Sequence, residues 1–255
     1  MAKTVAILNQ KGGVGKTTTA VNLCAAVGAL GKRTLLVDID PQGNATSGFG
    51  VSKRSRRSAY EVITGLCRSS EAVVKTNFEG VSIIPSHMNL AGAELEIIDL
   101  EQRERLLKNA LIELWEDYDF IFLDCPPSLG LITLNALTAA DTMLVPVQCE
   151  FYALEGLSQL MGTARRVKRL YNPYLELEGV VLTMYDGRLN LTTQVAAEVK
   201  NVFPGKVYST VIPRNVRLSE APSFGKPVIY FDPSSKGSLA YKSLAEEFLR
   251  NNGPI

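Results

Sequence analysis

The sequence predicts an α/β fold, a mostly parallel twisted sheet with helices on both faces. Short apolar runs alternate along its 255 residues with longer segments of helical periodicity, as in chains that wrap a sheet with helices. The short runs are apolar at every position, which is typical of parallel strands buried on both faces. A glycine-rich segment links the first run to the first helical segment, as in many βα units. We expect one domain over residues 1–255, because the length allows one sizeable core and no linker-like tract interrupts it.

The same patterns give the order of the elements. The expected strands are 5–8, 34–37, 81–84, 120–123, 143–147, 180–183 and 228–230. The expected helices are 16–30, 100–116, 131–139, 153–171, 191–202 and 238–249. The least regular stretch is 48–58, which carries several Lys and Arg residues.

Composition restricts the classes of function. Hydrophobic residues make up 46% and charged residues 21%, as in ordinary globular proteins, which argues against a disordered chain. The net charge is only +1, whereas proteins that bind nucleic acid through bulk charge are far more basic. Any DNA binding must therefore come from a local patch, one that an oligomer can assemble.

Cysteine and histidine usage argues against a metal cluster. The four cysteines show no C-x-x-C spacing, and His87 is the only histidine, so a zinc or iron–sulfur site within one chain is not expected. Scattered cysteines suit a reducing compartment. An apolar strand follows Met1 almost at once, without the pattern of a signal peptide, and no apolar run is long enough to cross a bilayer. We expect a cytoplasmic protein.

The strongest motif is the segment 9–18, N-Q-K-G-G-V-G-K-T-T, between the first strand and the first helix. This is the context of a P-loop, in which glycines let backbone N–H groups approach phosphate oxygens at the positive end of a helix. Lys16 is expected to reach the β- and γ-phosphates, and the Thr17 hydroxyl to bind Mg²⁺. The residues expected from this motif to hold the nucleotide are Gly12, Gly13, Val14, Gly15, Lys16, Thr17 and Thr18.

Carboxylates at two strand ends are candidates for the metal and the attacking water. Asp124 ends the apolar run 120–123, where ligands of open α/β sheets bind, and we assign it to Mg²⁺. Asp38 and Asp40 close the second strand. The alternative for all of these carboxylates is a role as a cap or turn residue.

The glycine-rich segment resembles the deviant Walker A motif, K-G-G-x-G-K-T-T, of the P-loop NTPase family that includes ParA, Soj, MinD, nitrogenase iron protein and arsenite-pump ATPases. Within that family, long runs of the chain are similar to the ParA/Soj chromosome-partitioning ATPases; these runs are 37–48, 123–137, 145–160 and 211–227.

The resemblance implies specific roles. Lys11 would cross to the phosphates of a second chain, so that ATP makes a sandwich homodimer. Asp40 would position the attacking water, with a place near the metal. Asp38 is the second candidate for that role, and is otherwise structural or near Mg²⁺. The segment 125–130 resembles the second switch of the family, and Pro213 and Asn215 would form part of the adenine pocket. Asn215 can equally be a helix N-cap.

The resemblance also implies partners. ParA dimers bind DNA without sequence preference, and Arg188 and Arg217 match positions with that role. A ParB/Spo0J-type protein would stimulate hydrolysis, and the chain would associate with the nucleoid. The basic clusters 165–169 and 53–57 are further candidates, for which a solvated surface is the alternative.

Other functions remain open at this point. One alternative is a MinD-like positioning ATPase at a membrane or polar complex, although the last expected helix balances its charges and reads as a core-packing helix. Another is a metabolic P-loop ligase of the dethiobiotin synthetase type. The chain lacks the N-terminal helix-turn-helix extension of longer plasmid relatives, so we do not expect direct operator binding.

Overall fold

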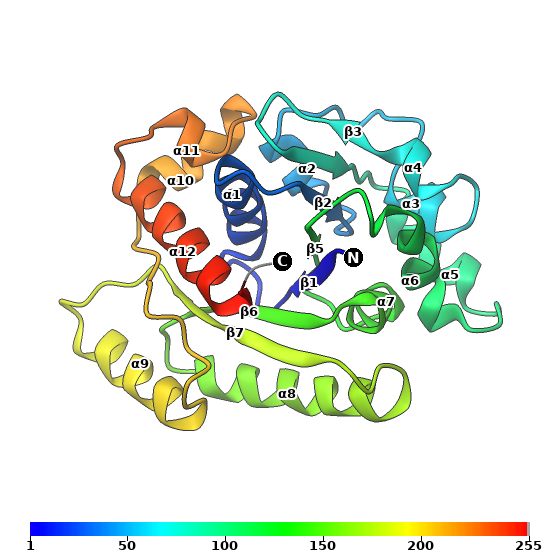
Figure 1. Ribbon diagram of the computed structural model, residues 1–255. Coiled ribbons are helices and arrows are strands. Elements are labelled where there is room, and N and C mark those ends of the chain that lie inside the picture. Colours follow the sequence, from blue (N-terminus) through cyan, green and yellow to red (C-terminus); the bar gives the residue numbers. More distant parts are fainter. Residues whose placement is uncertain (254–255) are drawn as a thin grey trace.

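The computed structural model describes residues 1–253, and its centre is a seven-stranded sheet (Figure 1). The strand order is β3-β4-β2-β5-β1-β6-β7, and every pairing is parallel except that of β3 with β4. This confirms the expected mostly parallel sheet. The strands are β1 Lys3–Ile7, β2 Thr34–Asp38, β3 Val74–Lys75, β4 Val81–Ile84, β5 Phe120–Asp124, β6 Thr142–Gln148 and β7 Glu176–Thr183.

Helices follow most strands and cover both faces of the sheet, as Figure 1 shows. The helices of the N-terminal half are α1 Lys16–Ala29, α2 Asn44–Gly48, α3 Ala59–Ile63, α4 Ser69–Ala72, α5 Leu90–Ile97 and α6 Leu106–Leu111. Those of the C-terminal half are α7 Leu131–Ala139, α8 Ala153–Leu170, α9 Asn190–Val202, α10 Val216–Glu220, α11 Val228–Phe231 and α12 Lys236–Asn252. Short 3₁₀ turns lie at Arg103–Arg105, Ile112–Leu114 and Ala221–Phe224.

Each face of the sheet has its own apolar core. Helices α1 and α10 to α12 pack on one face, and α3 with α5 to α9 pack on the other. Strand β2 serves both cores, because Leu35 and Val37 point to one face and Leu36 to the other. A strand buried on both sides has no polar face, which explains why the strands are uniformly apolar in the sequence.

The register of the central strands brings their carboxyl ends to one edge. Asp124 at the end of β5 lies opposite Asp38 of β2 and Ile7 of β1. The loops that follow these strands therefore meet at this edge, where ligands of open α/β sheets bind.

One predicted strand is wrong. Residues 228–230 belong to the short helix α11, which starts directly after Pro227. The Val228 N–H donates to the Asn22 side-chain oxygen of α1 at 2.7 Å, and Val228 and Ile229 are buried in the core beside that helix. A short apolar run is compatible with either a strand or a buried helix, and here packing on α1 decides.

The expected helix 100–116 is also shorter than predicted. Gln102 has a left-handed backbone, with φ 52°, so regular α-helix begins only at Leu106 and ends at Leu111. The helices α2, α3, α4, α5 and α10 were not expected, and most of them have only four or five residues. The other predicted strands and helices match to within a few residues.

The last helix, α12, packs into the core. Tyr241, Leu244, Ala245 and Phe248 are buried among the residues of the core that also contains α1. This confirms the core-packing interpretation of its single apolar stripe. Across residues 1–253, no helix combines the length and the apolar character that crossing a membrane requires.

Candidate nucleotide site

The loop between β1 and α1 has the backbone conformation of an anion cradle. Gly13 and Gly15 have φ values of 74° and 89°, a region that side chains strongly disfavour. Gly15 directly precedes the first residue of α1, Lys16, so the loop ends at the positive end of a long helix. A Cβ at Gly12 or Gly13 would meet nothing within 4 Å, so the loop faces open space.

Neighbouring strands hold this loop in place. The Asn9 side-chain amide donates to the Pro146 carbonyl oxygen at 2.8 Å, and the Thr183 hydroxyl donates to the Val14 carbonyl oxygen at 2.7 Å. These contacts come from β6 and from the end of β7. The side chain of Val14 is itself buried. The loop is therefore preorganised, which lowers the cost of ordering it around a ligand.

Lys16 lies buried at the start of α1. Its ammonium donates to the Lys11 carbonyl oxygen at 2.8 Å. Burial lowers its pKa, while Asp124 and Asp40 act in the opposite direction. A cation that has lost much of its hydration in this position interacts strongly with a phosphate anion.

A cavity of about 620 Å³ lies in front of the loop and unites several predicted residues. Gly12, Gly13 and Gly15 line it together with Lys16, Thr17 and Thr18, as predicted. Across from them, the second-strand loop contributes Asp40, Pro41, Gln42 and Asn44, and the loop after β5 contributes Pro126 and Pro127. Met88, Ala91 and Met184 complete the wall.

Asp124 lies fully buried at the end of β5, beside this cavity. Among the described residues, neither of its carboxylate oxygens has a hydrogen-bond partner in bonding geometry. Burial raises the pKa of Asp124 well above its usual range, and the carboxylate of Asp38 adds to the rise, whereas the nearby Thr17 hydroxyl and Lys16 lower it. A buried carboxylate without partners is costly, and a bound cation would offset that cost. The donor set of Asp124 and Thr17, two oxygen ligands, therefore fits Mg²⁺.

Asp38 and Asp40 have different surroundings. The backbone N–H and hydroxyl of Thr46 both donate to one carboxylate oxygen of Asp38 at 2.7 Å, and the Asp40 N–H donates to the other at 3.2 Å. Burial raises the pKa of Asp38 to about 6, although these hydrogen bonds counteract the rise. Through these hydrogen bonds Asp38 fixes the loop that follows β2, in keeping with the structural role considered for it. Asp40 lines the cavity, and one of its carboxylate oxygens accepts the Gln42 N–H at 2.9 Å.

A second cavity, of about 460 Å³, adjoins the first. The two share Gly15, Thr18 and Met184, so one extended ligand can occupy both. Pro213 and Asn215 line the second cavity, where the purine base was expected. The Asn215 side-chain oxygen accepts the Arg217 N–H at 3.0 Å and caps α10. The amide nitrogen has no hydrogen-bond partner within residues 1–253 and can donate to a base.

Lys11 and Val14 of the loop do not line the cavity, and Lys11, unlike the buried Val14, is exposed. Its ammonium forms an ion pair with Glu150, which follows β6 in the same chain. Both side chains are more than 40% exposed, and Lys11 does not line the cavity. The side chain is therefore accessible from outside the chain.

The predicted DNA-contacting arginines lie outside these cavities. Arg188 pairs with Asp186 at 2.7 Å, and its side chain is 89% exposed. Arg217, on α10, pairs with Glu220 at 2.8 Å and with Asp232 at 3.1 Å. Carboxylates thus balance both guanidinium groups locally.

Several residues that line the two cavities were not predicted from the sequence. Thr183 and Met184 lie at the carboxyl end of β7, and Met184 has an unusual left-handed backbone with φ 49°. Tyr241 of α12 lines the second cavity, and its hydroxyl lies 3.1 Å from that of Thr19. Thr183 could have been predicted as a lining residue from its position at the carboxyl end of a strand, whereas Tyr241 reaches the site only through the packing of α12 on α1.

Cys125, beside Asp124, is fully buried, and its pKa is strongly raised, which argues against a nucleophilic role.

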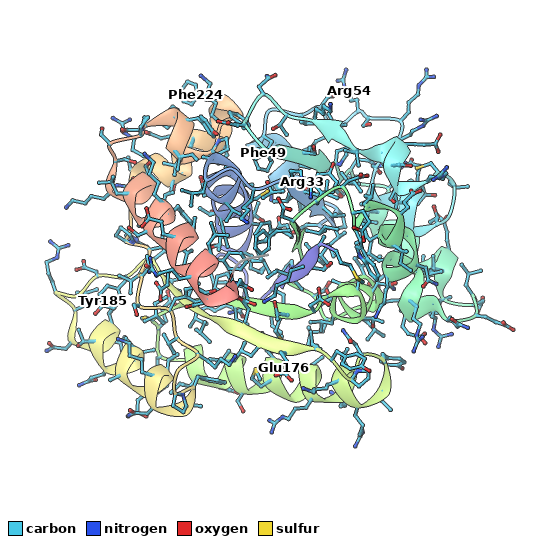
Figure 2. The ribbon with its side chains drawn as sticks, in the orientation of Figure 1. Arg33, Phe49, Arg54, Glu176, Tyr185 and Phe224 are labelled. Carbon is cyan, nitrogen blue, oxygen red and sulfur yellow. The ribbon has the colours of Figure 1, made fainter. Side chains whose placement is uncertain are left out.

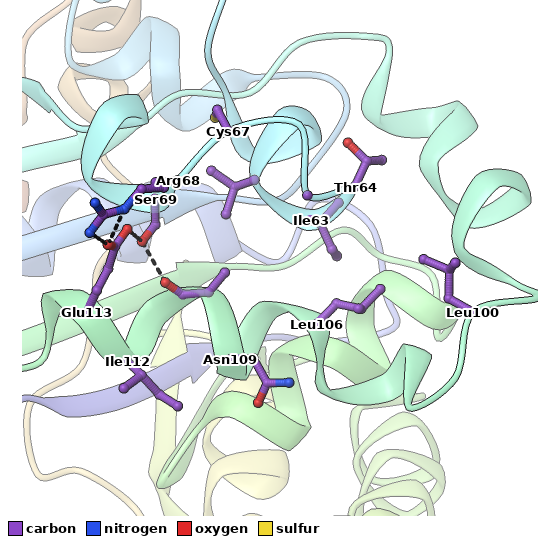
Figure 3. Close-up of a pocket in the computed structure, with 13 residues that line it drawn as sticks. Ile63, Thr64, Cys67, Arg68, Ser69, Leu100, Leu106, Asn109, Ile112 and Glu113 are labelled. Atoms are coloured by element: carbon purple, nitrogen blue, oxygen red, sulfur yellow. Dashed lines mark hydrogen bonds and ion pairs between the residues drawn. The ribbon is translucent and has the colours of Figure 1, made fainter.

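A separate hollow of about 440 Å³ lies away from these cavities, between α3, α4 and α6 (Figure 3). Its walls are mostly apolar and include Ile63, Leu106 and Ile112. Arg68 pairs with Glu113 at one end, as the dashed lines in Figure 3 show. None of the predicted nucleotide-binding residues lines this hollow, so it has no part in the candidate site.

Several known proteins are similar to this chain. A family model described as an AAA domain matches residues 2–177. The sporulation initiation inhibitor protein Soj of Bacillus subtilis is 55% identical over 252 residues, which are 98% of this chain and 100% of that protein. The chromosome partitioning protein ParA of Caulobacter vibrioides is 52% identical over 250 residues, 97% of this chain and 94% of that protein.

A similar solved structure is cobyrinic acid a,c-diamide synthase from Mycobacterium smegmatis, with bound ADP and magnesium. It has a TM-score of 0.84 at 39% identity and covers 96% of this chain and 93% of its own. The same protein has also been solved with an ATP analogue and magnesium. These likenesses confirm the predicted fold class.

Proposed function

The chain belongs to the family of the Soj and ParA chromosome-partitioning ATPases, and from this premise we propose that it is a Mg²⁺-dependent ATPase that segregates chromosomes or plasmids. One observation carries the proposal most directly. The glycine loop, Lys16, Thr17 and Asp40 line one cavity, Asp124 lies buried beside it, and the cavity continues into a second one lined by Asn215. This arrangement matches a nucleoside triphosphate with its metal at one end and its base at the other.

The roles of the residues follow from their surroundings. The backbone N–H groups of the loop and Lys16 bind the β- and γ-phosphates. Thr17 and Asp124 would hold Mg²⁺, and the bound ion would neutralise part of the phosphate charge. Asp40 orients the attacking water, and Asp38 and Thr46 fix the loop that carries Asp40. The surroundings of Asp38 support water positioning by Asp40 rather than by Asp38.

The finer proposal concerns assembly. ATP would join two copies of the chain face to face, with Lys11 of each reaching the phosphates held by the other. The exposure of Lys11 and its position outside its own cavity support this role. The dimer would then bind double-stranded DNA without sequence preference, through Arg188 and Arg217 of both chains, and associate with the nucleoid. A ParB/Spo0J-type partner would stimulate hydrolysis and so release the dimer.

DNA retention tests this proposal. We expect salt-sensitive binding of plasmid DNA with ATP and little with ADP, because the contacts are to phosphates and need two chains. Arg188→Ala combined with Arg217→Ala should abolish it at low salt. Arg165→Ala combined with Arg166→Ala is the charge-matched control on α8 and should retain most of it. Full retention by the first pair would show that the patch lies elsewhere, and loss by the second pair alone would assign it to α8.

Two other functions can be distinguished from partitioning with the same purified protein. A MinD-like protein would pellet with anionic liposomes in ATP rather than with DNA; the burial of one face of α12 argues against this alternative. A ligase would form a product from a small substrate, and the likeness to the synthase at 39% identity is the observation in its favour. The partitioning relatives are more similar, at 52% and 55%, and for that reason we favour partitioning.

A further inference from the structure

A polar hollow of about 420 Å³ lies at the outer edge of the sheet, beside β3 and away from the nucleotide cavities. Its walls come from the irregular loop after α2 and from β3 with the turn that follows. Arg54 and Lys75, both exposed, line it from these two segments. Figure 2 shows Arg54 at the outer edge of the molecule, above the β3 region. The polar groups that accompany them are Ser52, Ser55, Thr76 and Asn77.

The charge of this hollow is not balanced. Of the described residues that line it, none is acidic. In the part of the chain that the structure describes, neither Arg54 nor Lys75 forms a salt bridge, whereas Arg57 of the same loop pairs with Glu71 at 3.4 Å. Cations without a carboxylate partner keep their full attraction for an added anion, unlike Arg188 and Arg217, which must first leave their acidic partners.

Internal contacts fix the walls of the hollow. On the β3 side, the Thr76 hydroxyl donates to the Val81 carbonyl oxygen at 2.8 Å. On the loop side, the Ser55 hydroxyl donates to the Arg57 carbonyl oxygen at 2.7 Å. Lys53 also donates to the carbonyl oxygen of Gln42, which lies two residues beyond Asp40. Arg54 therefore projects from a loop that is anchored at both of its neighbouring positions.

The hollow adjoins the segment that follows Arg217. A Cβ added at Gly50, which lines the hollow, would lie 3.0 Å from the Gly225 carbonyl oxygen. Gly225 directly follows the 3₁₀ turn Ala221–Phe224, which itself follows α10 and Arg217. The hollow thus lies against the turn that follows α10.

We propose that this hollow holds a phosphate of the DNA backbone, with Arg54 and Lys75 as its cations. This inference rests on the proposed function, because it adds a contact to the same DNA-binding dimer. Paired cations with hydroxyl and amide groups and no carboxylate are the donors that bind phosphate without reading bases. A membrane surface fits less well, because Phe49 is buried and Val51 and Val74 are half-buried, so no apolar side chain here is free to insert.

The test measures DNA affinity over a series of salt concentrations in the Asp40→Ala background with Mg-ATP. Arg54→Ala combined with Lys75→Ala should weaken binding about tenfold or more and reduce the slope of log Kobs against log salt. Each lost phosphate contact reduces that slope by about 0.9, so the loss of one phosphate contact in each of two chains should reduce it by about 2. The matched control, Arg105→Ala combined with Lys108→Ala near α6, removes the same charge and should leave the slope unchanged. Sedimentation with ATP and circular dichroism, both without DNA, verify that each variant is folded and dimeric.

The outcomes separate the two proposals. If the parent dimer does not bind DNA at all, the proposed function itself is wrong. If the parent binds and the Arg54/Lys75 variant keeps its affinity and salt slope, the hollow is not a phosphate site while the proposed function stands. Equal losses in the variant and the matched control would attribute the effect to net charge and overturn the assignment. An arm with anionic lipid vesicles completes the test, because a loss confined to vesicles would assign the hollow to lipid headgroups and contradict the DNA contact.

Discussion

Lys11 forms an ion pair with Glu150 of its own chain. In the proposed dimer, the ammonium of Lys11 must instead reach the phosphates bound by the other chain. Glu150 therefore competes with the second nucleotide site for the same cation. The competition is modest, because exposed ion pairs contribute only about 0.2–1 kcal/mol.

Glu150→Gln should consequently favour the ATP-bound dimer. With the carboxylate charge removed, we expect half-maximal dimerisation at an ATP concentration up to about fivefold lower, measured by sedimentation in the Asp40→Ala background. Lys11→Ala should abolish dimerisation, and adding Glu150→Gln to it should change nothing. If Glu150→Gln impaired dimerisation instead, Glu150 would act within the dimer and not as a competitor.

Asp124→Asn should separate folding from metal binding. Without Mg²⁺, the variant should be at least as stable as the parent, because it removes a buried carboxylate whose oxygens have no hydrogen-bond partner among the described residues. Such an unpartnered buried group destabilises the parent by about 1–3 kcal/mol. With ATP, it should lose the part of the thermal stabilisation that depends on Mg²⁺. Denaturant unfolding and thermal scans with and without the metal measure both effects.

Asp119→Asn is the matched control, at the other end of the same strand. Asp119 accepts hydrogen bonds from the Arg33 N–H at 2.7 Å and from its guanidinium at 3.0 Å, so its replacement should destabilise the chain. Equal destabilisation by the two substitutions in metal-free buffer would mean that Asp124 is satisfied within the protein, contrary to the metal assignment.

Asn215→Asp should distinguish the two roles of Asn215. The aspartate keeps the side-chain oxygen that caps α10, so stability should stay within about 0.5 kcal/mol of the parent. It removes the amide donor, so ATP affinity should fall about fivefold, and the preference for ATP over GTP should narrow. Asn215→Ala should lose both the cap and the donor. Unchanged nucleotide affinity in the aspartate variant would confine Asn215 to capping.

The hollow at α3, α4 and α6 offers a pH-dependent prediction. The Ser70 N–H at 2.9 Å, the Ser69 hydroxyl and Arg68 stabilise the Glu113 carboxylate, and together they lower its pKa to about 2. Because this folded-state pKa lies below the unfolded value, the contribution is complete above about pH 4.5 and is lost as pH falls from there toward 2.

Glu113→Gln should therefore cost about 1 kcal/mol at neutral pH, and the difference from the parent should shrink steadily below about pH 4.5. Urea unfolding across this range measures it. Glu116→Gln, at an exposed position nearby, should show no such trend. A destabilisation by Glu113→Gln that stays constant down to pH 3 would contradict this account of Glu113.

Local sequence was sufficient to predict the edge of the sheet at which the candidate site lies. Gly15 and Lys16 have a fixed relation to the strand before them and the helix after them, and Asp124 follows an unmistakable buried strand. Each of these predictions needs only the rule that parallel strands end at a common edge.

What the sequence could not provide depends on contacts between distant segments. Glu150 forms an ion pair with Lys11, from which it is separated by 139 positions in the sequence. Tyr241 lines the second cavity because α12 packs on α1. The run at 228–230 is apolar enough for a strand, but it forms the helix α11, and the Val228 N–H donates to the Asn22 side-chain oxygen. Gln102 delays the start of the expected helix to Leu106, through a left-handed backbone that its residue type does not indicate.

The central claim is that ATP held between two chains creates the active dimer, and sedimentation of Asp40→Ala at saturating Mg-ATP tests it most directly. Asp40 lines the first cavity and, in the part of the chain that the structure describes, forms no hydrogen bond with the glycine loop. Its loss should therefore stop hydrolysis and leave nucleotide binding intact. We predict a stable dimer with ATP and a monomer with ADP or without nucleotide. A variant that binds Mg-ATP yet sediments as a monomer at every protein concentration would contradict the claim.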